Sequence, residues 1–449
     1  MRTLAFILLT LTNLSAQEST WWHIGLNVRL NTTFDPPVAS TGGCLSTIEG
    51  VASVSNSAGA FLFATDGVNV YDRNCNLMPN GTGLLGGTSS TQSAIIVQNP
   101  ANANIYYIFT VAQDAGANGV RYSEVNMALN GGFGNVTTNK NIPLTPFPMS
   151  EKLTSVRHCN NVDVWVVSKR WNDNGFRAWL VSATGVDPVP VISAAGYVPS
   201  TVVQSSFGQL KASPDGRKLA AAYYGTPPNT GGHRLEIHDF DNATGIVSGV
   251  TSVPINLAYG CEWSPNGELV YVSTNNGNLF QRNICTNVTT QIASVGSFLG
   301  SLQLTQQGRI LASRGTAAKL GCITQPNNSG IACAYNDNYV VLPSAGRMGL
   351  PNFAPYYFRP PTPMFTATQV SCGTFQFNPP PHQTTVCNPL PSPTYEWEYL
   401  NTINASTNPM QSFPTGMHTV SLEINFPCYT ETQTLTINSS TFSGMISGW

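Results

Sequence analysis

Short hydrophobic runs separated by polar turns recur along most of the chain. Each unit has a polar approach, a short strand, a turn at Gly or Asn, and a second β-prone strand. The pattern is clearest in residues 210–225, 261–274 and 302–315, with looser copies in residues 50–67, 94–110 and 155–171. Its turns fall at Gly59, Asn102, Asn161, Gly216, Gly267 and Gly308. A strand-rich repeat with a period of roughly 40 to 60 residues is typical of β-propeller blades.

The residue types inside the units agree with this interpretation. Asp215-Gly216 and Asn266-Gly267 are predicted to form two-residue hairpin turns, in which both residues tolerate φ > 0. The strands at 164–167 and 269–272 are apolar on both faces, as expected where each blade lies between two neighbours. Long helical periodicity is absent, so the sequence predicts an all-β fold.

Six units precede about residue 323, and a seventh blade is predicted from residues 338–342 combined with residues 21–30. Pairing of these two segments would close the ring. We therefore expect a seven-bladed, WD40- or YVTN-like propeller, with six and eight blades as the alternatives.

The rest of the chain divides by composition. Residues 1–16 have one positive charge and a short apolar stretch, which predicts a secretory signal peptide. Residues 17–358 form the propeller, residues 359–365 a proline-rich linker, and residues 441–449 a tail. Residues 366–440 carry alternating strands at sandwich spacing, which predicts a small immunoglobulin-like β-sandwich.

Charge and length restrict the partners. Only 9% of the 449 residues are charged and the formal net charge is -2, so the basic surface needed to bind nucleic acid is missing. No segment after the start approaches the roughly 18 apolar residues of a transmembrane helix. The sequence predicts an exported protein that is extracellular or held at the outer cell surface.

Ten cysteines fit an oxidising compartment, and none forms C-x-x-C or alternates with His at zinc-ligand spacing. Disulfides are the favoured interpretation, with free buried thiols as the alternative. Cys44 with Cys75, in one repeat unit, and Cys322 with Cys333, around a short loop, are the first candidate pairs. Spacing alone does not determine the connectivity.

A resemblance covers roughly residues 20 to 360. The segments that carry it keep one order along the chain: 21-WWHIGLNVRL-30, 49-EGVASVSNSAGAFLFATDGVNVYDRN-74, 78-MPNGTGLLGGTSSTQSAIIVQNP-100, 104-NIYYIFTV-111, 151-EKLTSVRH-158, 207-FGQLKASPDGRKLA-220, 239-DFDNATGIV-247 and 349-GLPNFAPYYF-358. This order resembles the N-terminal propeller of secreted surface proteins of gliding Bacteroidetes, often described as gliding-motility-associated or type IX secretion substrates. The resemblance implies a surface location and a role in adhesion or gliding.

The last domain looks like a PKD-type module, on the strength of Tyr395, Trp397, Gly416 and 418-HTVSL-422. Residues 399–408 replace the Gly-Asp-Gly turn that usually follows the PKD tryptophan, which makes the module divergent. A C-terminal sorting domain of the kind carried by type IX substrates does not follow before Trp449. Either the chain is a fragment or its export and anchoring differ.

Gly81, Gly83 and Gly86 spell G-x-G-x-x-G, the fingerprint of dinucleotide-binding loops. That fingerprint requires a strand before it, a helix after it and an acidic residue about 20 positions on. Here β-prone residues follow, and no carboxylate occurs between Cys75 and Asp114. We expect a loop between two blades and no nucleotide.

Five polar residues are candidates for a ligand site in the central channel. Lys211, Glu262 and Gln303 each stand five residues before a turn glycine, on the strand expected to lie nearest the axis. Gln92 and Lys152 occupy loosely equivalent places. Polar groups there either bind a ligand or line a water-filled bore.

Residues 233–242 hold two further candidates. On a strand, Arg234, Glu236 and His238 share one face, which suits acid–base chemistry or a metal, although a solvated edge is the favoured interpretation. Asp239, Asp241 and Asn242 could offer oxygens to calcium but lack the other EF-hand positions, so an Asx-type turn is favoured. No cofactor is expected.

The sequence therefore predicts a secreted or cell-surface binding protein without enzymatic activity, whose propeller binds an extracellular protein or a glycan. The alternative is an extracellular propeller enzyme, such as a polysaccharide lyase, a glycosidase or a lactonase-like hydrolase, acting at the channel mouth. Two carboxylates at that mouth with pKa values pushed apart would favour the enzyme.

Overall fold

The computed structural model describes residues 17–225, 232–358, 362–381 and 392–439. These residues fall into two compact units, one within Ser15–Arg359 and one from Pro360 onward. The predicted signal peptide, the whole predicted tail (residues 441–449) and part of the predicted linker lie outside the described residues.

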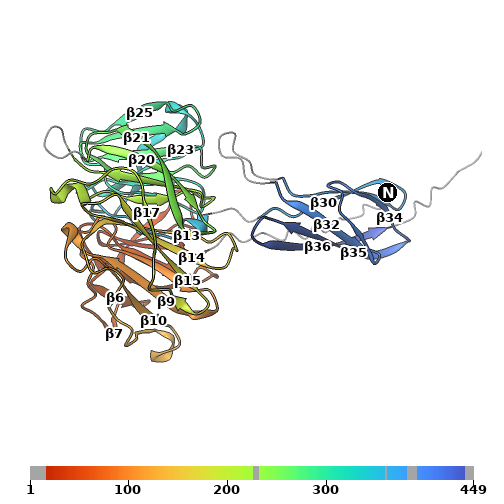
Figure 1. Ribbon diagram of the computed structural model, residues 1–449, viewed down its shortest axis with the longest axis horizontal. Coiled ribbons are helices and arrows are strands. Elements are labelled where there is room, and N and C mark those ends of the chain that lie inside the picture. The colour runs from red at the N-terminus through yellow and green to blue at the C-terminus, as the bar shows by residue number, and fades with distance from the viewer. Residues whose placement is uncertain (1–16, 226–231, 359–361, 382–391, 440–449) are drawn as a thin grey trace, which may run out of the picture. The chain divides into compact units, whose positions relative to one another are not determined.

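The first unit contains seven antiparallel sheets in chain order among its described residues (Figure 1). The first sheet consists of β1 (Trp21–Ile24), β2 (Leu26–Asn31) and β3 (Val38–Ser46). The second consists of β4 (Ala52–Ser55), β5 (Phe61–Thr65), β6 (Asn69–Asp72) and β7 (Leu77–Thr82). The third consists of β8 (Ala94–Asn99), β9 (Asn102–Val111), β10 (Val120–Asn126), β11 (Asn135–Val136) and β12 (Ile142–Pro143). The fourth consists of β13 (Met149–Arg157), β14 (Val164–Arg170), β15 (Gly175–Ser182), β16 (Gly185–Val186) and β17 (Val191–Ala194).

The remaining three sheets of this unit have four strands each. The fifth consists of β18 (Leu210–Ala212), β19 (Lys218–Tyr223), β20 (Arg234–Asp241) and β21 (Ile246–Pro254). The sixth consists of β22 (Ala258–Trp263), β23 (Leu269–Thr274), β24 (Asn278–Asn283) and β25 (Thr289–Ser294). The seventh consists of β26 (Leu302–Leu304), β27 (Ile310–Ser313), β28 (Lys319–Ile323) and β29 (Tyr335–Val341).

Helical structure in the described residues is limited to short 3₁₀ turns, which are η1 (Gln113–Ala115), η2 (Asn130–Gly132), η3 (Val203–Ser206), η4 (Gly330–Cys333) and η5 (Pro355–Phe358).

Hydrophobic cores lie between neighbouring sheets, because the middle strands present apolar residues on both faces. On β23, Leu269 and Tyr271 pack against the seventh sheet, whereas Val270 and Val272 pack against the fifth. Side chains alternate between the two faces of a strand, so a continuous apolar run fills two cores at once. This arrangement accounts for the runs that the sequence pattern identified.

The cores continue around the whole unit and close it into a ring. One core joins Trp22 of the first sheet to Leu320 of the seventh and Ala64 of the second. The unit is therefore a β-propeller, which confirms the predicted class. Five of the six turn positions expected from the sequence lie between the first two strands of a sheet, and the sixth, Asn102, is the first residue of the second strand, β9.

The predicted pairing of the two ends in one sheet is wrong. Residues 335–341 form β29, which pairs with β28, while β2 finds its partner in β3. The sequence 38-VASTGGCLS-46 is too rich in Gly, Ser and Thr to stand out as a strand, so its role was missed. The first and seventh sheets instead meet through side chains, including an ion pair of 3.0 Å between Arg309 and Asp35.

The hairpin turns also differ from the prediction. Gly216 donates its N–H to the carbonyl of Ser213 at 2.9 Å, which places Pro214 and Asp215 at the centre of the β-turn. The glycine then adopts a left-handed conformation, with φ of 70°. Proline pre-sets φ for a type I turn, so here only the glycine, which follows the turn, needs φ > 0.

One of the two candidate disulfides forms. Cys44 is bonded to Cys75 across a sequence separation of 31 residues. The Cys322–Cys333 pairing is wrong, since both residues are buried free thiols. Cys322 lies in the core between the first and seventh sheets and Cys333 in the core between the sixth and seventh, so a sheet separates them.

The second unit is a β-sandwich. One sheet consists of β30 (Thr366–Ser371), β31 (Thr374–Asn378) and β34 (Met410–Ser412). The other consists of β32 (Thr394–Tyr399), β33 (Thr402–Asn404), β35 (Gly416–Asn425) and β36 (Thr430–Ser439). An aromatic core that includes Phe377, Trp397 and Tyr399 lies between them. Its membership of the PKD class stays a prediction.

We expect the Cys44→Ala/Cys75→Ala double variant to lose about 3 to 4 kcal/mol of unfolding free energy, because the bond constrains the unfolded chain. Urea denaturation of both proteins measures this difference. Peptide mapping of the unreduced wild type should recover the Cys44–Cys75 linkage and no Cys322–Cys333 linkage. Equal denaturation midpoints would contradict the prediction.

Candidate binding site at the propeller axis

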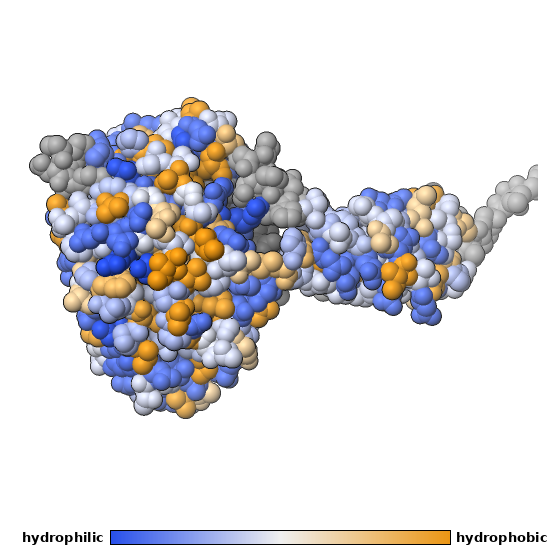
Figure 2. All heavy atoms as spheres, viewed as in Figure 1, coloured by the Kyte–Doolittle hydropathy of each residue, from blue (hydrophilic) through white to orange (hydrophobic). Residues whose placement is uncertain are grey.

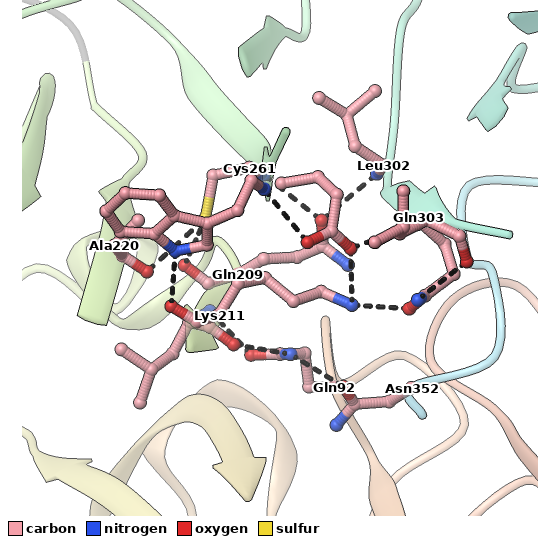
Figure 3. A network of polar contacts seen from close by, with 12 residues as sticks. Gln92, Gln209, Lys211, Ala220, Cys261, Leu302, Gln303 and Asn352 are labelled. Carbon is pink, nitrogen blue, oxygen red and sulfur yellow. Dashed lines mark hydrogen bonds and ion pairs between the residues drawn. The ribbon is translucent and has the colours of Figure 1, made fainter. Parts of the chain in front are cut away.

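In the third to seventh sheets, the first strand has a hydrogen-bonded neighbour on one side only, and its other edge faces the axis. The main-chain N–H and C=O groups on such an edge are buried and require partners. Polar side chains supply them, as Figure 3 shows for Gln92 and Gln209. Asn352 does the same for two main-chain carbonyls.

Gln92 connects three sheets. Its Oε1 accepts hydrogen bonds from the N–H groups of Leu210 at 2.7 Å and Leu153 at 3.1 Å. Its Nε2 donates to the carbonyl of Leu210 and to Oδ1 of Asn352, both at 3.1 Å. Asn352 in turn donates to the carbonyls of Ala94 and Leu153. The Gln92 side chain is thus fully engaged inside the protein.

Gln209 has the same role on the other side of the axis. Its Oε1 accepts from the N–H groups of Cys261 at 3.1 Å and Leu302 at 3.0 Å (Figure 3). These two N–H groups belong to the first strands of the sixth and seventh sheets. One amide oxygen therefore links two neighbouring strands that share no backbone hydrogen bond of their own.

Lys211, Glu262 and Gln303 meet in the interior. Lys211 Nζ lies 3.4 Å from Glu262 Oε2 and donates a hydrogen bond to Gln303 Oε1 (Figure 3). The Glu262 carboxylate also accepts from the N–H groups of Trp263 at 2.9 Å and Leu304 at 3.1 Å. Burial raises the pKa of Glu262, and the neighbouring Lys211 partly opposes that rise.

Lys152 is buried but stands apart from this group. Its Nζ donates to the carbonyls of Ser206 at 3.1 Å and Phe207 at 2.6 Å, and it lies 4.6 Å from the centre of the Tyr223 ring. Burial lowers the pKa of Lys152 to about 7, with Glu151 opposing. All five predicted residues are therefore buried, and their contact with a ligand stays a prediction.

Gln209 and Asn352 were missed in the sequence. Gln209 precedes Lys211 by two positions and so shares its strand face. Asn352 lies beyond the last strand of the unit, where no strand pattern points to the axis. In the sequence, residues 349–358 stand out only as one of the segments that carry the family resemblance.

Two carboxylates and a tyrosine, Glu49, Glu151 and Tyr259, form what we call the carboxylate cluster, near the starts of β4, β13 and β22. Burial and then the charge of Glu151 raise the pKa of Glu49 to about 8. Burial also raises the pKa of Glu151, although its carboxylate accepts from Thr91 N–H and Asp114 N–H, both at 2.7 Å. Tyr259 lies beside both carboxylates, and burial followed by their charge raises its pKa.

Arg234, Glu236 and His238 lie on β20, but the favoured solvated edge is wrong because Glu236 and His238 are buried. Glu236 accepts from the Tyr197 N–H, and its Oε2 lies 3.3 Å from His238 Nε2. His238 Nδ1 is hydrogen-bonded to the carbonyl of Gly249 at 2.9 Å. Arg234 stacks on Tyr197.

The Asp239–Asn242 run forms local contacts. Asp241 accepts hydrogen bonds from Ala243 N–H at 2.9 Å and Thr244 Oγ1 at 2.8 Å, the pattern of an Asx-type turn. Asp239 pairs with Lys218 at 2.7 Å.

One group of three potential metal ligands occurs among the described residues: His23, Cys44 and Cys75. The two sulfurs are bonded to each other. His23 Nδ1 accepts a hydrogen bond from the Cys44 N–H at 2.9 Å. Burial, followed by the charge of Arg29, lowers the pKa of His23 to about 3. The three groups are therefore used within the protein.

The G-x-G-x-x-G glycines carry the chain from the second sheet to the third. Gly81 lies in β7, and Gly83 and Gly86 lie between β7 and β8. Gly86 donates its N–H to the carbonyl of Gly67 at 3.0 Å. A strand follows these glycines and no helix, as predicted.

In comparisons with known proteins, no family model and no curated protein matches the chain. A solved structure from Bacteroides fragilis, provisionally described as a 6-phosphogluconolactonase, shares 11% identity, with a TM-score of 0.39. The match covers 86% of this chain and 97% of that one. At this level of similarity it carries no argument about function.

Among the described residues, no helix has the length and apolar character to cross a membrane.

Replacing Lys211 by Met should destabilise the protein by about 3 to 5 kcal/mol, because the buried Glu262 carboxylate loses its compensating charge. The Lys211→Met/Glu262→Gln double variant should lose less than the sum of the two single losses. Urea denaturation of the four proteins measures the coupling. Strictly additive losses of unfolding free energy would contradict the coupling between Lys211 and Glu262.

Glu49→Gln should change stability in a pH-dependent way. The folded pKa of about 8 exceeds the ordinary 4.5, so the folded state binds this proton more tightly than the unfolded state. The stabilisation of the folded state by the proton on Glu49 is complete below pH 4.5 and is lost as the pH rises towards 8. The variant should therefore match the wild type near pH 4 and exceed its Tm near pH 8.

Thermal melts at both pH values test this, with Glu268→Gln, at the hairpin between β22 and β23, as the control. A Glu49→Gln variant less stable than the wild type at pH 8 would show that the carboxylate is stabilising there.

Proposed function

We propose that this chain is a secreted or cell-surface binding protein without enzymatic activity, and that its propeller binds an extracellular protein or a glycan. The order of the segments within residues 20–360 supports a role in gliding or surface attachment and export by the type IX route. The second unit serves as a spacer or an additional contact surface.

The observation that carries this proposal is the state of the polar groups at the axis. Gln92, Gln209 and Glu262 each hold main-chain groups of neighbouring first strands. Side chains committed in this way stabilise a scaffold, and they are not available to transfer protons to a substrate. The axis thus favours a rigid binding platform.

The Cys44–Cys75 disulfide supports the proposed location, because stable disulfides persist in oxidising compartments outside the cytosol. The surface of the viewed face agrees as well, since hydrophilic residues predominate there and hydrophobic ones are interspersed (Figure 2). With 9% charged residues, that hydrophilicity depends mainly on neutral polar side chains.

The carboxylate cluster favours a second candidate, an extracellular enzyme that acts at the channel mouth. Glu49 and Glu151 both have raised pKa values, and a protonated carboxyl can act as a general acid. The Glu151 carboxylate, however, is already engaged by the N–H groups of Thr91 and Asp114, both at 2.7 Å, which leaves it less available to transfer protons. We therefore rank the enzyme second.

The purified full chain should bind members of a glycan array or an extracellular protein fraction, and should leave polysaccharides and lactones unchanged. Reducing-sugar release, unsaturated-product absorbance and lactone titration measure turnover. Turnover that is lost in both Glu49→Gln and Glu151→Gln would replace the binding proposal by the enzyme.

A further inference from the structure

A pocket of about 270 Å³ opens at the other end of the first strands from the carboxylate cluster. Gln98 and Asn99 line it from the end of β8, and Arg157 lines it from the end of β13. The remaining lining residues are Glu18, Pro100, Asn161, Val162, Tyr356 and Tyr357. None of these residues belongs to the central network described above.

Both ends of the propeller unit contribute residues to this pocket. Glu18 precedes β1, and its carbonyl accepts a hydrogen bond from the Ser55 N–H at 2.8 Å. Tyr356 and Tyr357 belong to η5, and their rings contact each other edge to face at 4.9 Å. Tyr357 is anchored in the core that closes the ring, so this part of the pocket is fixed before any ligand arrives.

Glu18 provides the polar atom of the pocket that lacks a partner. Its Oε2 is buried and accepts no hydrogen bond from the described residues. Burial raises the pKa of Glu18, and the nearby Arg157 partly opposes that rise. A buried acceptor without a donor costs free energy, and a ligand hydroxyl placed there would remove that cost.

Arg157 is already engaged. Its Nη1 donates to the carbonyl of Val162 at 2.9 Å, and its guanidinium lies 4.0 Å from the centre of the Tyr356 ring. The one carboxylate and the one guanidinium of the pocket balance in charge, so the pocket favours a neutral ligand over an ion.

The other lining groups suit a polyhydroxylated ligand. Asn161 presents a planar amide, which can donate to one hydroxyl and accept from its neighbour. Gln98 Nε2 already donates to the carbonyl of Ala103 and to the Tyr106 hydroxyl, so Gln98 offers its amide oxygen as an acceptor. The two tyrosines and Val162 add apolar surface for the C–H faces of a ring. The volume lies just below the ~300 Å³ at which pockets for drug-sized ligands begin, which suits one or two sugar rings.

We propose that this pocket binds a neutral saccharide, with Glu18 Oε2 accepting hydrogen bonds from its hydroxyls. The inference rests on the proposed binding function and specifies its ligand class and its location on the propeller.

The test uses the purified full chain and an array of neutral mono- and disaccharides containing glucose, galactose, mannose and N-acetylglucosamine. Glu18→Gln replaces the acceptor by an amide, and Val162→Trp narrows the rim of the pocket. Val162 is 51% exposed, and the 55% exposed Val288 between β24 and β25 provides a matched control, Val288→Trp. Melting curves show that the variants are folded.

We expect the wild type and Val288→Trp to bind the same sugar with equal Kd. Glu18→Gln should raise that Kd tenfold or more, since a charge-assisted hydrogen bond contributes at least that factor. Val162→Trp should raise the Kd to a similar extent, because the larger side chain narrows the rim of the pocket.

Binding that survives both pocket variants would overturn the inference while leaving a glycan-binding protein in place. Binding of charged amino acids or of a protein in preference to every neutral sugar would also overturn it, again without removing the binding function. Hydrolysis of the sugar would overturn the proposed function itself.

Discussion

The unpaired edges of the innermost strands are the constraint on which this propeller depends. Seven sheets arranged around an axis leave main-chain groups facing inward, and a buried group without a partner costs on the order of 1 to 3 kcal/mol. Gln92, Gln209 and Asn352 satisfy several of these groups with a few amide atoms. Amides suit the task because each one offers both donors and an acceptor. The buried Lys211–Glu262 pair is held in the same way, by main-chain N–H groups at 2.9 and 3.1 Å.

Hydrogen bonds at the axis and apolar packing between the sheets both hold the ring together. Apolar residues such as Tyr271 and Val272 secure each sheet to both of its neighbours. That packing sets the spacing but carries little directional information. The hydrogen bonds at the axis are directional, and they fix how far each first strand slides along its neighbour. A scaffold held by both keeps its two faces rigid, and rigid faces present loops without a cost in ordering.

Much of the fold followed from the sequence, because it depends on local pattern. The turn glycines and the doubly apolar strands mark one unit after another. Lys211, Glu262 and Gln303 could be placed together because their offset from a turn glycine repeats. Closure of the ring could not be predicted, since β3 lacks the apolar pattern that identifies a strand. The carboxylate cluster, Asn352 and the pocket at Glu18 combine residues from distant loops, and no spacing in the sequence links them.

The placement of Glu18 and η5 has a mechanical consequence. The main chain leaves the propeller after Phe358, directly after the two tyrosines that line the pocket. A tensile load on the main chain at Phe358 therefore reaches these tyrosines before it reaches β29. Glu18, in the segment that starts the ring, lines the same pocket, so a molecule bound there would contact both ends of the propeller chain. Under the proposed binding function, affinity for the ligand and resistance of the ring to pulling would then depend on the same contacts.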